Sequence, residues 1–430
     1  MRRAIYGFHR SGAWWENYFA TYITADASGP RMTRGVKDAS VYLGTRHLNL
    51  TGLRFVISTD DLLVVGRRSQ VNRLASVLRV RFGDVGWRDL HQNWYCGARY
   101  FQSCPFHQKC YARISMNDYI DKSYESLSKF GYGGPTAGTA HQTAVMIKKT
   151  TPSLVGRTIT NIDRQNKPTV FQLERHRAVG GQLGWISSHR DDIRYAVAIA
   201  GSLTLNSSDE IYRSILLFCM RYLHSSKNRS SCFHDPGDAK RDRIIGWCDS
   251  SFHSYPSTVG DRLASHQGYL LTLNGAILTA RSNKCSKAET QGPHSSTAEA
   301  EMSVFLNCCV SALYHRDLMT EWGYDYSAPI AIMTDSSAVF HNILNSKVTG
   351  VTKYWQSDFW RCHGMYRAGL IQPCLITTAC QLSDFLTKPV SAEIFRRNTN
   401  DLYCDVTDAD NAPARKMGDV IPTISPGHTY

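Results

Sequence analysis

Two short apolar stretches that each lead into an aspartate constrain the fold of this chain most. Ile244–Asp249 and Ile330–Asp335 both have the pattern of a buried strand followed by a carboxylate. Between them, two apolar runs flank Asn274-Gly275, a dipeptide that favours a two-residue hairpin turn. A long helical pattern separates this hairpin from the second strand. This order of elements predicts a mixed sheet with helices packed on it.

The start of that helix carries two more carboxylates. Ser295-Ser296-Thr297 supplies natural N-cap residues, and Glu299 and Glu301 lie in or near the first turn. Each acid also has a structural explanation, because glutamate at a helix start favours the helix dipole and aspartate after a strand forms turns. A further acid, Asp384, lies in a stretch that is predicted to open a final helix.

Together these carboxylates fit one chemical requirement. Hydrolysis of a phosphodiester by two Mg²⁺ ions about 4 Å apart needs several carboxylates that converge from different elements. Oxygen ligands suit Mg²⁺ or Mn²⁺ rather than zinc. Strand ends and a helix start can bring such groups together from distant sequence positions.

The four acidic segments resemble, in order, recurring strings of the ribonuclease H domain of copia-type LTR retrotransposon Pol polyproteins. The matching strings are WCD at 247–249, SSTAEAE at 295–301, TDS at 334–336 and QLSDFLTKP at 381–389. The resemblance covers roughly 242–392 and implies an RNase H-like fold with a mixed five-stranded sheet. The implied catalytic and metal-binding residues are Asp249, Glu301, Asp335 and Asp384, with Glu299 as the alternative glutamate. Glu301 is preferred because a small helical residue, Val304, follows it by three positions, as in the family.

The resemblance also implies an activity and its partners. It implies an endonuclease of the hydrolase class that uses two Mg²⁺ or Mn²⁺ ions to cleave the RNA strand of an RNA–DNA hybrid. A different interpretation stays open, in which the chain is an inactive retroelement relic that only binds nucleic acid. The extra Ala298 in the helix-start string favours the relic, and the four retained carboxylates favour the enzyme.

The front of the chain resembles the reverse transcriptase of the same family. Phe55–Gly66, which contains Asp60 and Asp61, resembles the Asp-Asp hairpin of the polymerase palm. A palm needs a further metal-binding aspartate on an earlier strand, which would precede Tyr6 and Met1. We therefore expect a polymerase remnant that does not synthesise DNA alone and that another polymerase chain could complement.

These patterns give an α+β fold class and a domain order. We predict a truncated reverse-transcriptase palm and thumb followed by the RNase H-like sheet with its packed helices. The predicted segments are a partial palm at 1–105, a thumb- or connection-like region at 106–225, a linker at 226–241, the RNase H-like domain at 242–392 and a flexible tail at 393–430.

Charge and cysteine content bear on partner and compartment. The net charge is +13, and residues 1–110 hold 16 Lys and Arg against 7 Asp and Glu. A basic surface concentrated at the front suits a polyanionic partner such as nucleic acid. No stretch has the length of a membrane span, so no membrane partner is expected. Thirteen scattered cysteines indicate a reducing, intracellular compartment, with cytoplasm and nucleus not distinguished.

Overall fold

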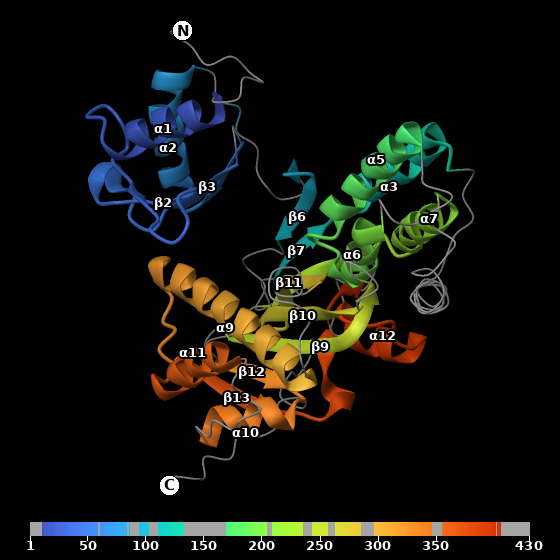
Figure 1. The fold of residues 1–430 in the computed structure, drawn as a ribbon. Coiled ribbons are helices and arrows are strands. Elements are labelled where there is room, and N and C mark those ends of the chain that lie inside the picture. The colour runs from blue at the N-terminus through green and yellow to red at the C-terminus, as the bar shows by residue number, and fades with distance from the viewer. Residues whose placement is uncertain are drawn as a thin grey trace. The chain divides into compact units, whose positions relative to one another are not determined.

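The computed structural model of the chain is drawn in Figure 1. The residues that it describes are 11–58, 61–83, 86, 94–102, 111–132, 169–203, 209–234, 243–256, 263–284, 296–345, 355–400 and 402–405. The chain divides into two compact units, residues 1–100 with 314–327, and residues 101–313 with 328–430.

The first unit combines a small antiparallel sheet with two helices. Its helices are α1 (Ser11–Thr24) and α2 (Arg68–Phe82), and its sheet runs β1 (Thr33–Arg34), β2 (Val41–Leu43), β3 (Arg54–Ser58), β4 (Asp61–Val65), with the 3-10 helix η1 (His47–Asn49) between β2 and β3. Its core combines aromatic and aliphatic residues, and Tyr42 stacks there on Phe55 with ring centroids 4.8 Å apart. Leu74 and Leu78 of α2 are buried in the same cluster, because residues four apart share one helix face. Near residue 100, β5 (Trp94–Tyr95) and β6 (Ala98–Gln102) pair as a hairpin.

The hairpin predicted around the Asp-Asp pair is present in this unit. β3 pairs with β4 up to Ser58 and Asp61. Asp61 is exposed at the start of β4. Asp60 and the residues around Tyr6 lie outside the described residues. The structure therefore gives the position of one of the two hairpin aspartates.

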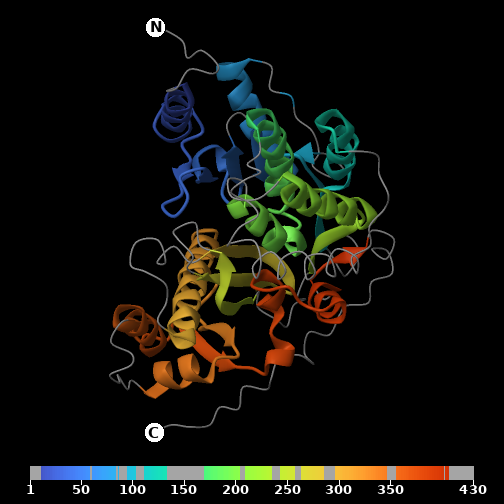
Figure 2. The ribbon, with the colours of Figure 1, turned by 45° about the vertical axis from the view of Figure 1, so that its right-hand side comes forward.

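The second unit is built on a five-stranded mixed sheet in the order β11-β10-β9-β12-β13 (Figures 1 and 2). Its strands are β9 (Ile244–Pro256), β10 (Leu263–Leu273), β11 (Ala276–Lys284), β12 (Ile330–Thr334) and β13 (Ile371–Leu375). β9, β10 and β11 pair antiparallel, whereas β12 runs parallel to both β9 and β13. Asn274 and Gly275 form the turn between β10 and β11 with φ of 51° and 94°, the positive values that a type I′ turn requires. The predicted mixed sheet is therefore present.

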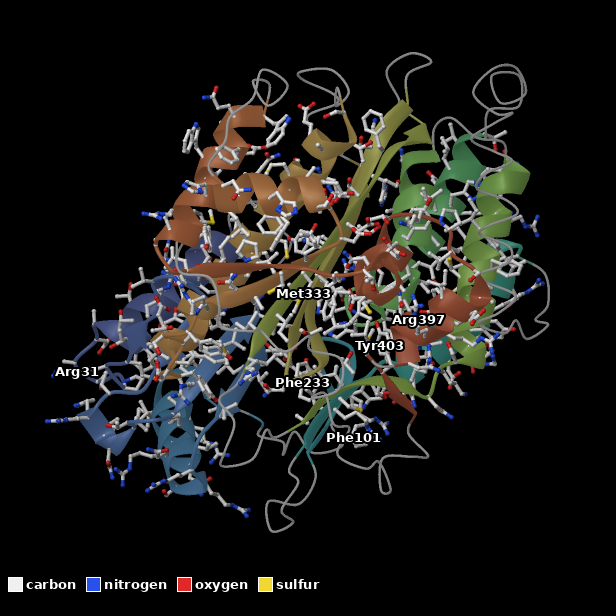
Figure 3. The ribbon with its side chains drawn as sticks, turned by 90° about the horizontal axis from the view of Figure 1, so that it is seen from below. Arg31, Phe101, Phe233, Met333, Arg397 and Tyr403 are labelled. Atoms are coloured by element: carbon white, nitrogen blue, oxygen red, sulfur yellow. The ribbon has the colours of Figure 1, made fainter. Side chains whose placement is uncertain are left out.

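The long helix α9 (Thr297–Glu321) packs on this sheet. Gly246 of β9 lies beneath it, where a Cβ atom would stand 2.7 Å from Cys308 Sγ and 2.8 Å from Ile332 Cδ1. Only glycine therefore lets strand and helix approach this closely. Met333 of β12 is 2% exposed and is surrounded by other side chains (Figure 3).

A helical part of the second unit packs beside the sheet. Its elements are β7 (Tyr111–Ser115), α3 (Asn117–Ser126), η2 (Leu127–Phe130), α5 (Val170–Ile186), η3 (Asp191–Ile193), α6 (Arg194–Leu203), α7 (Asp209–Ser225) and β8 (Arg229–His234). The elements after α9 are α10 (Ser337–Asn345), α11 (Gln356–Arg367), η5 (Thr378–Cys380), η6 (Leu382–Leu386), α12 (Ala392–Asn400) and β14 (Cys404–Asp405). Helix α6 contacts β11, and η6 contacts both β9 and β10.

Three predicted boundaries differ from the structure. The strand expected to end at Asp249 continues to Pro256, because β9 keeps pairing with β10 beyond that point. Part of the stretch predicted as a linker, 226–241, forms β8, which pairs with β7 and β14. Helix α12 and β14 lie where a flexible tail was expected from residue 393. Backbone pairing with strands distant in the sequence is the reason for β8 and β14.

Candidate metal centre

Strand register brings Asp249 and Asp335 to the same level of the sheet. β9 and β12 run parallel, and their last paired residues are Trp247 and Met333. Asp249 and Asp335 each follow two residues later, so their backbones advance together beyond the paired region. Asp249 remains inside β9, opposite Gly268 of β10, and Asp335 directly follows β12.

Helix α9 supplies Glu301 to the same place. Ser296 caps this helix, since the backbone amide of Glu299 donates to Ser296 Oγ at 3.2 Å. Glu299 therefore belongs to the first turn and is partly exposed, whereas Glu301 is 7% exposed. The backbone amide of Ser250, next to Asp249, donates to Glu301 Oε1 at 3.3 Å.

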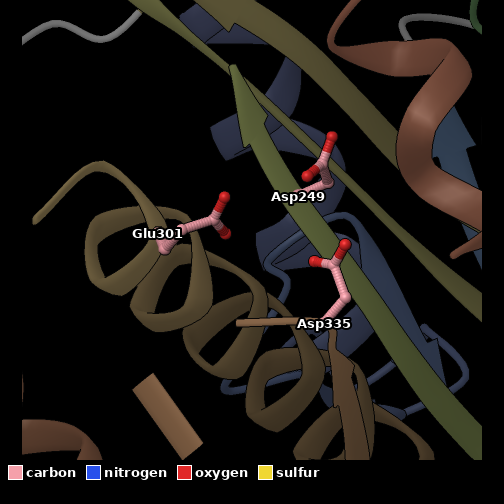
Figure 4. A group of neighbouring side chains, drawn as sticks. All are labelled: Asp249, Glu301 and Asp335. Atoms are coloured by element: carbon pink, nitrogen blue, oxygen red, sulfur yellow. The ribbon is translucent and has the colours of Figure 1, made fainter. Parts of the chain in front are cut away.

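The three carboxylates Asp249, Glu301 and Asp335 form one group. Each offers an oxygen within 4.8 Å of the oxygens of the other two. Figure 4 shows their side chains turned toward a shared space from a strand, a helix and a loop. Three of the four acids predicted from the sequence thus come together, and the glutamate among them is Glu301 rather than Glu299.

Burial makes this group electrostatically unfavourable without a cation. It raises the pKa of Asp249 to about 6, with Lys388 and Thr387 opposing the effect and the neighbouring carboxylates adding to it. Burial, followed by the charges of Asp249 and Asp335, raises the pKa of Glu301 well above its usual range. Removing carboxylates from water while placing them side by side disfavours their charged forms in both ways.

The fourth predicted acid, Asp384, is linked to Asp249 through Lys388. Asp384 is 4% exposed in η6, and its Oδ1 stands 3.0 Å from Lys388 Nζ. The same ammonium stands 3.5 Å from Asp249 Oδ2, which also accepts a hydrogen bond from Thr387 Oγ1. Asp384 is not part of the three-carboxylate group. A lysine therefore joins the fourth acid to the first.

Several polar neighbours of the acids were not singled out by sequence reasoning. Thr378 Oγ1 donates to Asp335 Oδ2 at 2.8 Å. Thr387 and Lys388 belong to the QLSDFLTKP string, but nothing in the string alone gave them a role. The signal that could have found them is their spacing, since residues three and four positions after Asp384 lie on its side of a helical turn.

The donor set fits a hard divalent cation. All three donors are carboxylates, the ligands that Mg²⁺ and Mn²⁺ prefer. Glu301 Oε2 is buried without a hydrogen-bond partner among the described residues. A buried polar atom of this kind is rare unless an ion or water satisfies it. The group can therefore hold a divalent cation through Asp249, Glu301 and Asp335.

Comparison with known proteins finds transposon polyproteins. The chain is 22% identical over 401 residues to the "Retrovirus-related Pol polyprotein from transposon RE2" of Arabidopsis thaliana, covering 92% of this chain and 24% of that polyprotein. It is 24% identical over 225 residues to the corresponding protein from transposon RE1 of the same plant, covering 51% of this chain and 14% of that one. The chain spans a quarter or less of each relative. The predicted resemblance to retroelement Pol polyproteins is confirmed.

Comparison with solved structures finds a ribonuclease. RNase H1 from the halophilic archaeon Halobacterium salinarum aligns with a TM-score of 0.22 and 16% identity, over 34% of this chain and 93% of that chain. No protein-family model matches the chain. Among the described helices, none has the length and apolar content needed to cross a membrane.

Proposed function

We propose that this chain is a retroelement-derived ribonuclease that cleaves the RNA strand of an RNA–DNA hybrid with divalent metal ions. The buried group of Asp249, Glu301 and Asp335 is the observation that carries the proposal. The similarity to transposon Pol polyproteins supports it, because the four acidic strings occur in the order that this family's ribonuclease H domain implies.

Each residue of the centre has a proposed role. Asp249, Glu301 and Asp335 would hold Mg²⁺ or Mn²⁺. Thr378 fixes the orientation of the Asp335 carboxylate through its hydrogen bond, and Thr387 does the same for Asp249. Bound divalent ions would supply the Lewis acidity that phosphodiester hydrolysis needs. Asp384 is the fourth acid of the proposed centre, and Lys388 links it to Asp249.

The proposed substrate agrees with the charge of the chain. A net charge of +13 favours binding to the phosphate backbone, which requires no base sequence. Helix α2 places Arg68, Arg79 and Arg81 at exposed positions of the first unit. We assign these arginines to phosphate contacts.

The first unit is proposed to be a remnant of the reverse-transcriptase palm. Asp61 keeps the position of a hairpin aspartate, but among the described residues it belongs to no group of three candidate metal ligands. Polymerase chemistry is therefore not assigned to Asp61 alone. A second polymerase chain that supplied the other acids would be the partner that restores it.

Incubation of the purified chain with a labelled RNA–DNA hybrid tests the proposal. Mg²⁺ and then Mn²⁺ should support cleavage of the RNA strand and leave the DNA strand intact. Asp335→Asn should abolish cleavage, because it removes one charge from the metal group. Asp61→Asn is the matched control, since it makes the same change at an exposed aspartate of the other unit, and it should retain full cleavage.

The same experiment can contradict the proposal. If the folded chain binds the hybrid but cuts neither strand with either metal, the inactive relic is the correct interpretation. Cleavage that survives Asp335→Asn would show a contaminating nuclease or a different centre. Either result removes the proposed function from this group of carboxylates.

A further inference from the structure

We infer that the Lys388 ammonium competes with the second of the two divalent ions for Asp249 and Asp384. The centre therefore binds its two ions in two steps of unequal affinity. The inference rests on the proposed function and deepens it. The one tight ion is held by Asp249, Glu301 and Asp335. The second ion requires Lys388 to move away from the pair that it bridges, Asp249 and Asp384.

The position of the ammonium carries this inference. Lys388 Nζ lies 3.0 Å from Asp384 Oδ1 and 3.5 Å from Asp249 Oδ2. Asp384 lies outside the three-carboxylate group, so a second ion that used this fourth acid would compete with Lys388 for it. A lysine ammonium is a compact point charge, so it can occupy a place between two carboxylates much as a small cation does.

Local packing keeps the lysine there. Lys388 follows Asp384 by four residues, and its backbone amide bonds to the Asp384 carbonyl at 3.3 Å. Thr387, between them, donates from its Oγ1 to the Asp384 carbonyl at 3.1 Å and also to the Asp249 carboxylate. The turn therefore fixes the lysine stem relative to both acids. Gly268 permits this arrangement, because a Cβ there would stand 2.7 Å from Thr387 Cγ2.

The backbone of Lys388 is fixed, but its side chain can move. Its side chain is 38% exposed, whereas those of Asp249 and Asp384 are 4% and 6% exposed. A long flexible stem that reaches solvent can swing outward without unfolding the turn. Charge balance also favours unequal binding of the two ions. Four carboxylates and one ammonium leave enough negative charge to bind one divalent ion. A second ion must overcome repulsion by the Lys388 ammonium.

Titration of Mn²⁺ into the chelator-treated full chain, followed by calorimetry, tests the inference. The wild type should bind one ion tightly and a second more weakly. Lys388→Met should tighten the second step about tenfold, because it removes a positive charge next to that site. Lys388→Arg keeps the charge and should leave the second step weak. Lys129→Met, which removes an exposed lysine of η2, is the matched control and should change neither step.

Further variants keep the test decisive. The double variant Lys388→Met with Asp384→Asn should not show the tighter second binding step, since the second ion then lacks the Asp384 carboxylate. If Lys388→Met unfolds, Lys388→Gln replaces it as the neutral variant. Two equal steps in the wild type, or a second step that no neutral Lys388 variant changes, would overturn the inference.

The outcome is separable from that of the proposed function. The chain could bind Mn²⁺ in steps that change with Lys388 and yet never cut the hybrid. That result would support the role of Lys388 and contradict the proposed ribonuclease activity. Cleavage of the hybrid together with Mn²⁺ affinities that no Lys388 variant changes would support the ribonuclease activity and contradict the role of Lys388. A wild-type chain that binds no Mn²⁺ would remove both.

Discussion

Two buried acidic groups of the second unit can be compared, one in its helical part and one on its sheet. In the helical part, Arg190 lies 2.7 Å from Asp192, and Arg194 lies 2.6 Å from Asp191. On the sheet, no ion pair to Glu301 or Asp335 is found within the described part of the chain, and Glu301 Oε2 has no hydrogen-bond partner there. Each acid of the first group has an arginine partner, whereas among the described residues of the second group only Asp249 has a basic partner, Lys388.

The difference shows in the titration of the acids. Burial disfavours the charge of Asp192, but Arg190 outweighs it and holds the pKa of Asp192 below its usual value. At Glu301, burial and the adjacent acids act in the same direction, and the pKa lies well above the usual range. A buried acid with a guanidinium is part of the fold, whereas a cluster of buried acids without one needs a cation from solution.

The largest effect that sharpens this comparison is expected at Glu301. Glu301→Gln should lower hybrid cleavage about a thousandfold or more, because it removes several kcal/mol of metal-dependent stabilisation of the transition state. Glu299→Gln is the matched control two residues away in the same helix, and it should change the rate less than threefold, about 0.6 kcal/mol. Single-turnover rates with Mg²⁺ measure both. Equal losses in the two variants would show that the preference for Glu301 is wrong.

Next in size is the stability effect at the neutralised group. Asp192→Asn leaves Arg190 buried without its charge partner, and Tyr222 loses a charged acceptor for its hydroxyl. Breaking a buried ion pair from one side costs about 3–5 kcal/mol, so the free energy of unfolding should fall by that amount. Urea denaturation monitors it. A loss below about 1 kcal/mol would mean that the pair does not stabilise this part of the fold.

Asp249 and Asp192 should respond to pH with opposite signs. A raised pKa at Asp249, about 6, means that its contribution to metal-free stability is greatest below pH 4 and is lost as the pH rises through 6. Relative to Asp249→Asn, the wild type should therefore lose about 3 kcal/mol between pH 4 and pH 7. The lowered pKa of Asp192 predicts the reverse, since its stabilisation is lost as the pH falls.

Thermal unfolding of the wild type and both Asn variants, in chelator, measures these differences. Adding Mn²⁺ at pH 7 should restore the stability lost at Asp249 and leave the Asp192 difference unchanged. The same slope with pH for the Asp249 and Asp192 differences would contradict the opposite pKa shifts.

The smallest effect concerns the turn that carries Asp384. Gly268→Ala places a Cβ 2.7 Å from Leu386 Cβ, so η6 must shift, at a cost of about 1–3 kcal/mol. Gly181→Ala, inside α5, meets no atom within 4 Å and should instead stabilise by about 0.5–1 kcal/mol. Denaturation midpoints of the two variants should therefore move in opposite directions, and a stabilised Gly268→Ala would contradict the packing described here.

Much of the sheet and of its acidic group could be predicted from the sequence. Apolar strands before Asp249 and Asp335, the Asn274-Gly275 turn and the helix start after Ser296 are local signals, and local signals fix element type. Once these elements form, parallel register brings the two aspartates together. The choice of Glu301 depended on the family resemblance, and the cap at Ser296 gives its physical reason.

The remainder depended on contacts between distant residues. The strand at Arg229–His234 needs pairing with β7 and β14, and β14 in turn needs β8. The position of Lys388 between Asp249 and Asp384 depends on a turn packed across the sheet. No pattern within a short window of sequence reports such contacts.

Location of bound Mn²⁺ by anomalous scattering from crystals of the full chain tests the central claim most directly. A strong peak coordinated by Asp249, Glu301 and Asp335 is expected, with no peak at Asp191 and Asp192, which have their own arginines. A fully occupied Mn²⁺ at the arginine-paired acids, or a three-carboxylate group that stays empty at saturating Mn²⁺, would contradict it.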